Sequence, residues 1–227
     1  MTVSSEMILA AFLLTGLMLT ASSRLLHCIR IVAVQGLLLG LLPLVIRNWE
    51  IGADQITVSL LNIAVKAVAL PWLLMLAMRR AGVRRELEPL IGYSASLLIA
   101  LALIGVSFAV GTRLRLSGEA IPLAMPVAFS TMLIGLFMVI ARRKAITQVI
   151  GFLIFENGIS LFGIGLMLEY GLAVELGILL DVFVLVFVMG IAVFQISREF
   201  EHIDADKLNL LGDWSAPDES SEEEGER

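Results

Sequence analysis

The chain has 227 residues, of which 59% are hydrophobic and 16% are charged, with a net charge of −5 and a mean hydropathy of +0.95. A water-soluble globule of this composition would expose far too much apolar surface, so that class is excluded and most of the chain is expected to lie in lipid. Because Cys28 is the one cysteine, an intrachain disulfide and a four-thiolate iron–sulfur site are excluded. The two histidines are His27 and His202, and the second falls in the polar tail, so a bis-histidine haem within the bilayer is also excluded. We therefore predict no cofactor and no metal site on this chain, and expect any redox chemistry to take place on another chain.

Seven apolar segments are long enough to cross a membrane, which takes about 20 residues for roughly 30 Å of hydrocarbon. They are residues 6–22, 25–46, 55–78, 90–111, 121–140, 145–168 and 175–197. No Lys or Arg precedes the first segment, whereas a secretory signal begins with a positive region, so we expect the first helix to be retained. The predicted fold class is all-α, a polytopic membrane protein with seven transmembrane helices.

The connections between these segments differ strongly in positive charge. One set carries nine cations and the other carries three; the nine are Arg24, Arg79, Arg80, Arg84, Arg85, Arg142, Arg143, Lys144 and Arg198, and the three are Arg47, Arg113 and Arg115. We expect the chain in the cell inner (plasma) membrane. By the positive-inside rule, this asymmetry places the N-terminus on the outer side of that membrane and the C-terminus in the cytoplasm.

The composition changes abruptly at the end of the seventh segment. From Arg198 onward the chain has eleven acidic residues against three basic ones. We expect a transmembrane domain over residues 1–198 and an acidic cytoplasmic tail over 199–227, disordered from about residue 215 by its low hydrophobicity and high charge. Simple solvation is one explanation of these charges, and the leucine-rich part of the tail before Trp214 could instead pack on a cytoplasmic partner.

A weak internal repeat is visible. The stretch from Gly16 through Ser22-Ser23-Arg24 to Gln35 parallels the stretch from Gly135 through Arg142-Arg143-Lys144 to Glu156, at an offset of 119 to 121 residues. It suggests two parallel three-helix copies joined by the fourth helix, with Gln35 in the place of Glu156.

Three ionisable residues stand out well inside apolar segments that are otherwise nearly free of charge. Glu156 and Lys66 lie near the middle of theirs, and Asp181 lies about six residues into the last one. A charge at such a depth costs at least about 2.5 kcal/mol, so each is by default a functional candidate. Desolvation raises the pKa of a carboxyl group and a nearby ammonium lowers it, so a Lys/Glu pair can be tuned toward the neutral range, where it loads and releases protons. Pro71 follows Lys66 and cannot donate to the Ala67 carbonyl, so we expect a kink and a water site there.

Structural alternatives remain open for these residues. A buried Lys/Glu pair can serve only to hold helices in register, and Asp181 can sit in a wet outer crevice. His27 and Arg30 are typical of interfacial anchors rather than relay residues. The pair Gly36 and Gly40 is a small-xxx-small motif that predicts a helix contact.

Together these residues resemble the hydrogenase-4 membrane component E family of formate hydrogenlyase-type and related group 4 hydrogenase complexes. The similarity rests on Phe155-Glu156-Asn157-Gly158, on Glu175-Leu176-Gly177-Ile178 with Asp181, and on Lys66 with Pro71, and it extends through all seven segments to Asp204–Gly212. The last three segments also resemble the small three-helix subunit of respiratory complex I, which shares a basic pair, here Arg142-Arg143, then Ile150-Gly151 and an intramembrane glutamate followed by Asn157. The glutamate of the small subunit comes two residues after Ile-Gly, whereas Glu156 comes five residues after Gly151. This shift of three residues is close to one helical turn, so the carboxylate is expected on a similar face of the helix at a different depth.

The resemblance implies a non-catalytic subunit of a membrane-bound oxidoreductase. Its partners would be antiporter-like membrane subunits, a quinone-site-like membrane subunit, and cytoplasmic subunits with nickel–iron and iron–sulfur centres. We expect a proton path through Glu156, Lys66 and Asp181, with Asn157 and Gln35 beside it. The alternatives are an assembly scaffold without proton conduction and a stand-alone small transporter.

Overall fold

The computed structural model describes residues 3–46, 53–80, 91–111, 113, 123–166 and 190, and these residues form helices and connections without a strand. The helices are α1 (Val3–Ala21), α2 (Leu25–Ile46), α3 (Ala53–Asn62), the π-helix η1 (Ile63–Ala69), α4 (Leu70–Arg80), α5 (Tyr93–Gly111), α6 (Ala124–Ala141) and α7 (Ala145–Gly165). Because α3, η1 and α4 follow one another without a gap, the described residues make six continuous helices.

The all-α prediction is confirmed for this part of the chain. Five helices are long and apolar enough to cross a membrane: Leu25–Val45, Ser59–Arg79, Tyr93–Gly111, Ala124–Ala141 and Ile146–Gly165. Ser5–Ala21 is a shorter apolar helix. The first six predicted segments differ from the observed helices by three residues or fewer at each end. The seventh, 175–197, and the acidic tail lie outside the described residues.

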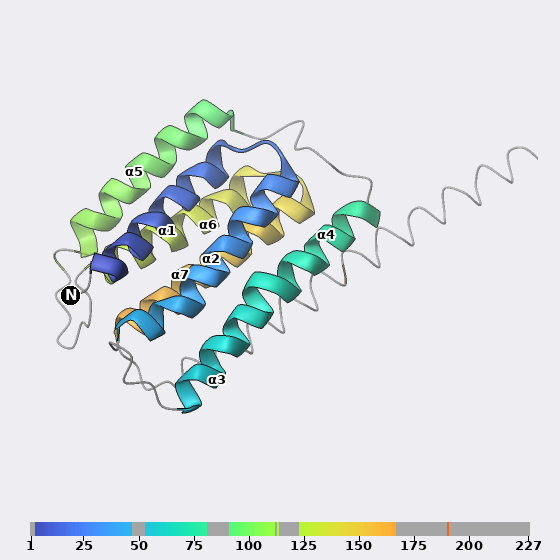
Figure 1. Cartoon of the computed structure of the whole chain (residues 1–227). Coiled ribbons are helices and arrows are strands. Elements are labelled where there is room, and N and C mark those ends of the chain that lie inside the picture. Colours follow the sequence, from blue (N-terminus) through green and yellow to red (C-terminus); the bar gives the residue numbers. More distant parts are fainter. Residues whose placement is uncertain are drawn as a thin grey trace, which may run out of the picture.

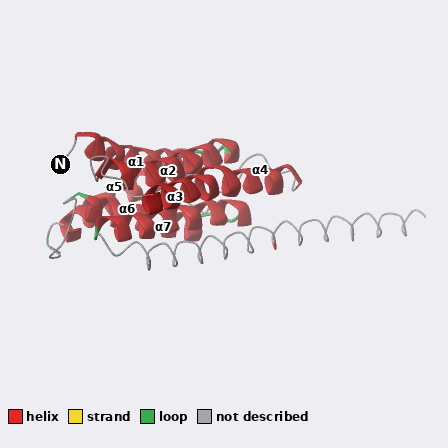
Figure 2. Ribbon diagram, turned by 60° about the horizontal axis from the view of Figure 1, so that its bottom comes forward, coloured by secondary structure: helices red, strands yellow, loops and turns green. Residues whose placement is uncertain are grey.

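The helices lie side by side as a bundle, each running opposite to the one before it along the chain (Figure 1). The pair α1 and α2 packs on the pair α6 and α7, and the two pairs form two layers in Figure 2. Helix α5 covers one edge against α1 and α6. The continuous helix α3–η1–α4 covers the opposite edge against α2.

Glycines bring α6 and α7 into backbone contact. A Cβ added at Gly135 would lie 2.3 Å from the Phe155 nitrogen, and one added at Gly158 would lie 2.7 Å from the Met132 nitrogen. Backbone atoms cannot move aside as a flexible side chain can, so these positions admit no side chain without separating the helices. The two helices are therefore fixed in depth relative to each other.

Two short connections have the same hydrogen-bond pattern. Before α2, the Arg24 carbonyl accepts from the amides of His27 and Cys28 at 3.0 and 3.1 Å. Before α7, the Lys144 carbonyl accepts from the amides of Thr147 and Gln148 at 2.9 and 3.0 Å. Each connection leaves only three residues between antiparallel helices, so α1 with α2 and α6 with α7 form two similar hairpins.

Replacing Gly135 with alanine should lower the thermal stability of the purified protein in detergent. The added methyl group overlaps the α7 backbone, and overpacking of this kind costs about 1–3 kcal/mol. The matched control is Gly105→Ala on α5, where an added Cβ meets nothing within 4 Å and alanine has the better helix propensity. Equal midpoints for the two variants in a thermal unfolding experiment would contradict the packing described for α6 and α7.

Candidate functional site

Lys66 lies in the π-helix η1, where each backbone hydrogen bond spans five residues instead of the four of an α-helix. The amide of Leu70 donates to the Val65 carbonyl, a bond over five residues. Pro71 has no N–H to continue this register onto the Lys66 carbonyl. The sequence predicted that Pro71 would disturb the Ala67 carbonyl, but the π-helical register moves the effect onto the backbone of the lysine itself. Short π-helical segments occur frequently at functional sites.

Two glycines of helix α2 allow close packing against the segment that contains Lys66. A Cβ added at Gly36 would lie 2.7 Å from the Lys66 carbonyl carbon and 2.8 Å from its oxygen. A Cβ added at Gly40 would lie 2.3 Å from the Ile63 side chain and 3.3 Å from the Ser59 oxygen. The prediction of a helix contact at Gly36 and Gly40 is therefore confirmed, and this contact sets how close Lys66 stands to the rest of the bundle.

Glu156 and Ser160 occupy the side of α7 that faces away from α6. Gly151 and Gly158 mark the α6 side, and at 100° per residue Glu156 and Ser160 lie about half a turn from it. The two polar side chains are four residues apart, one above the other on the same face. They consequently point toward α2 and the π-helix.

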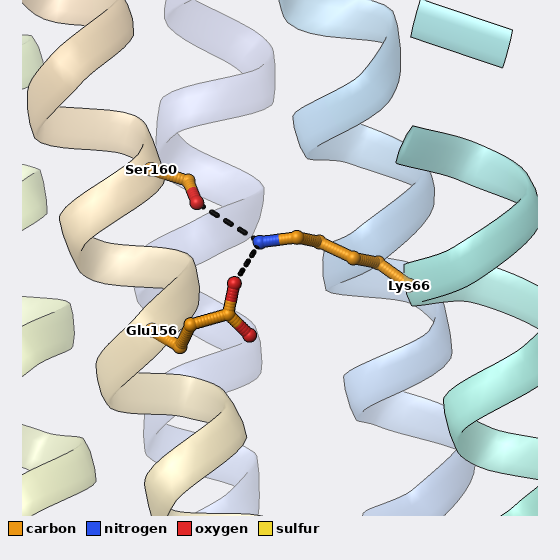
Figure 3. A network of polar contacts seen from close by, with 3 residues as sticks. All are labelled: Lys66, Glu156 and Ser160. Atoms are coloured by element: carbon orange, nitrogen blue, oxygen red, sulfur yellow. Dashed lines mark hydrogen bonds and ion pairs between the residues drawn. The ribbon is translucent and has the colours of Figure 1, made fainter. Parts of the chain in front are cut away.

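The lysine and the glutamate meet in an ion pair across the bundle. The Lys66 Nζ donates to Glu156 Oε1 and also to Ser160 Oγ at 2.9 Å (Figure 3). Lys66 is 3% exposed and Glu156 is 0% exposed. Removing two charges from water costs several kcal/mol per ion, and only mutual attraction with good hydrogen bonds offsets this cost. The sequence predicted both residues and their pairing, and the structure brings them together over 90 positions of chain.

A second buried polar contact lies in the first hairpin. Gln35, which is fully buried, donates from Nε2 to Thr15 Oγ1 at 3.0 Å. Its Oε1 is buried and has no hydrogen-bond partner among the described residues. Because its neighbour Gly36 touches the Lys66 backbone, Gln35 lies at the same depth as the ion pair. We refer to Thr15, Gln35, Lys66, Glu156 and Ser160 as the polar layer.

The polar layer separates two apolar clusters. The cluster toward the cation-rich end contains, among others, Leu19, Ile29, Leu74, Val149 and Leu153. The cluster toward the other end contains Leu9, Phe12, Leu39, Leu42, Ala124, Val127, Ala128 and Leu161. Along α1, α2 and α7 the polar residues fall between members of the two clusters. The ion pair is thus shielded from lipid and enclosed by apolar packing above and below.

The remaining predicted site residues have different outcomes. Asn157 is 3% exposed and follows Glu156 on α7. Asp181 lies outside the described residues. Within the described ranges, no group of three or more His, Cys, Asp or Glu residues lies close enough to hold a metal ion.

Sequence reasoning missed the position of Arg142. We grouped it with the surface cations of the connections, but its side chain is 1% exposed. Its Nη2 donates to the Thr20 carbonyl at 2.9 Å, and its guanidinium carbon lies 4.9 Å from the centre of the Tyr93 ring. Arg142 therefore ties the ends of α1, α5 and α6 together. The helix ends that meet there are far apart in the sequence, so no local pattern could reveal this role.

Comparison with known proteins gives one relative. Over 187 residues the chain is 35% identical to Uncharacterized protein Rv0085 of Mycobacterium tuberculosis (strain ATCC 25618 / H37Rv), covering 82% of this chain and 85% of the relative. The chain belongs to the Rv0085 family. No family model matches it, and no solved structure matches it.

Replacing Lys66 with methionine should destabilise the protein far more than replacing both partners of the ion pair. The single change removes the cation from a buried carboxylate, and breaking a buried pair in this way costs about 3–5 kcal/mol, whereas apolar replacement of both partners is often neutral. Thermal unfolding in detergent of Lys66→Met, Glu156→Met and the Lys66→Met/Glu156→Met double variant measures the coupling. Ser160→Ala leaves the ion pair in place and should cost about 1.5–3 kcal/mol, because the lost hydrogen bond comes from a charged donor. Additive effects of the two single changes would contradict the pairing.

Proposed function

We propose that this chain is a non-catalytic membrane subunit of a hydrogenase-4-like, complex I-related oxidoreductase, and that it contributes to proton translocation coupled to electron transfer. The observation that carries the proposal is the buried Lys66–Glu156 pair in a bundle of apolar helices. Ionisable groups are costly in hydrocarbon and are most often found there on ion pathways and proton relays.

In this proposal Glu156 carries the proton and Lys66 supplies the charge that sets its affinity. When Glu156 takes up a proton its attraction to the ammonium falls, and Ser160 Oγ, 2.9 Å from Nζ, offers the lysine an alternative acceptor. The Oε1 of Gln35 is buried without a hydrogen-bond partner among the described residues and lies at the same depth, which favours a water molecule at this level of the bundle. Asn157 and Asp181 would extend the path, Asp181 toward the outer side.

The proposal includes a topology of seven spans with the N-terminus outside the plasma membrane and the C-terminus in the cytoplasm. It rests on the positive charge of the connections and on the antiparallel order of the helices in Figure 1. The matching bonds at Arg24 and Lys144 support the two parallel three-helix copies. The acidic tail would then face the cytoplasmic subunits that carry nickel–iron and iron–sulfur centres.

A second candidate function is an assembly scaffold that conducts no protons. It is favoured by the apolar clusters on both sides of the polar layer and by the glycine contacts that lock the helices at fixed depths. In that case the ion pair would hold α7 against η1, since buried ion pairs can specify one arrangement among several.

Replacing Glu156 with glutamine should abolish proton pumping by the native complex and leave its assembly intact. The amide keeps the shape and a hydrogen-bond acceptor for Lys66 but carries no exchangeable acid. Pumping is followed with a pH-sensitive dye in inverted vesicles from the native host, and assembly is followed by native gel electrophoresis. The control is Ser107→Ala, which removes a buried hydroxyl that donates to the Leu103 carbonyl within α5, outside the polar layer. Normal pumping would rule out the relay, and loss of the assembled complex would favour the scaffold.

Purification of the tagged full chain from its native membrane should recover a hetero-complex. We expect antiporter-like subunits, a quinone-site-like membrane subunit and the metal-containing cytoplasmic subunits in native mass spectra. Recovery of the chain alone, or as a homo-oligomer, would reject the subunit assignment in favour of a stand-alone transporter.

A further inference from the structure

The exposed face of α2 changes from cationic to apolar along its length. Arg24, His27 and Arg30 are spaced three residues apart and all three are exposed, so they lie along one side of the helix. Further along the same side, Val34 is 47% exposed, Leu37 is 41% exposed and Leu41 is 36% exposed. We call these six residues the α2 stripe.

The cations of the α2 stripe can meet near one end of the bundle. Arg30 lies about 7.5 Å along the axis from Leu25, the first residue of α2, at 1.5 Å per residue. Side chains of a helix lean toward its N-terminus, and a long arginine extends its charged head toward the interface. The guanidinium of Arg30 can thus approach the level of Arg24 and His27.

This end of the bundle has an excess of positive charge within the described residues. The acidic residues among them are Glu6 and Asp54, which lie in the first turns of α1 and α3 at the opposite end of the bundle, and Glu156, which lies in the polar layer. None of the three cations of the stripe forms an ion pair with another described residue. Nothing in the described chain therefore neutralises the cations of the stripe.

We propose that the α2 stripe binds an anionic phospholipid, with its phosphate at Arg24, His27 and Arg30 and its acyl chains along Val34, Leu37 and Leu41. The distance from Arg30 to Leu41 is about 16 Å along the helix, close to half of the roughly 30 Å hydrocarbon core, which is the depth of one leaflet. The order of charge and apolar surface matches that of a phospholipid, and clusters of basic residues at the end of a transmembrane helix attract anionic head groups. The site is independent of the proton path, because its residues point away from the polar layer.

Native mass spectrometry of the full chain tests this site. The purified protein is incubated with equal amounts of phosphatidylglycerol and phosphatidylcholine that carry the same acyl chains, and the bound lipids are counted. The wild type should retain phosphatidylglycerol in preference. Each arginine near an anionic head group contributes about fivefold, so the double variant Arg24→Gln/Arg30→Gln should lose roughly 25-fold of this preference.

Arg113→Gln, which removes an exposed cation beyond the end of α5, is the matched control and should retain the preference. Equal loss in Arg113→Gln and the double variant would overturn the proposal in favour of a general charge effect. Displacement of the lipid by millimolar inorganic phosphate would overturn it in favour of a free-anion site. A wild type without preference, whose stripe is instead covered by a co-purifying acidic membrane subunit, would overturn it in favour of a protein interface.

Discussion

The ion pair between Lys66 and Glu156 is the interaction on which the rest of the bundle depends. It joins a helix at one edge to a helix of the lower layer, and both charges are buried. Such a pair is tolerable only when the two groups meet with good geometry. That requirement explains the close glycine contact between Gly36 and Lys66 and the glycine contacts that set α7 against α6. Lys66 itself lies in the π-helix η1, and its Nζ reaches Glu156 and Ser160 on α7.

The position of the pair between two apolar clusters has two physical consequences. A low local dielectric strengthens the attraction between the charges, and it also makes any change of protonation at Glu156 energetically large. The same geometry could therefore store a proton or hold two helices in register. What separates these functions is access to water, for which the buried, unsatisfied oxygen of Gln35 is the strongest indication among the described residues.

Much of this arrangement could be predicted from the sequence, for identifiable reasons. Apolar runs of about 20 residues locate the helices, and the high cost of a charge in hydrocarbon singles out Lys66 and Glu156. The π-helical register was not predictable, because residue propensities distinguish a π-helix poorly from an α-helix. Pro71 predicted a kink near Lys66, but not this register. The inward turn of Arg142 depends on where α1 and α5 end, and the Thr15–Gln35 contact depends on the packing of the first hairpin. Both contacts join residues that are far apart in the sequence, so no local sequence pattern predicts them.

We propose that Glu156 exchanges a proton with water while it is paired with Lys66. Infrared difference spectroscopy of the reconstituted protein between two pH values tests it directly, because a protonated carboxylic acid has a carbonyl band that the carboxylate lacks. We predict a titrating carboxyl band that is absent from Glu156→Gln and shifted in Lys66→Met. A spectrum of the wild type without any titrating band that Glu156→Gln removes would contradict the account and leave the pair a purely structural element.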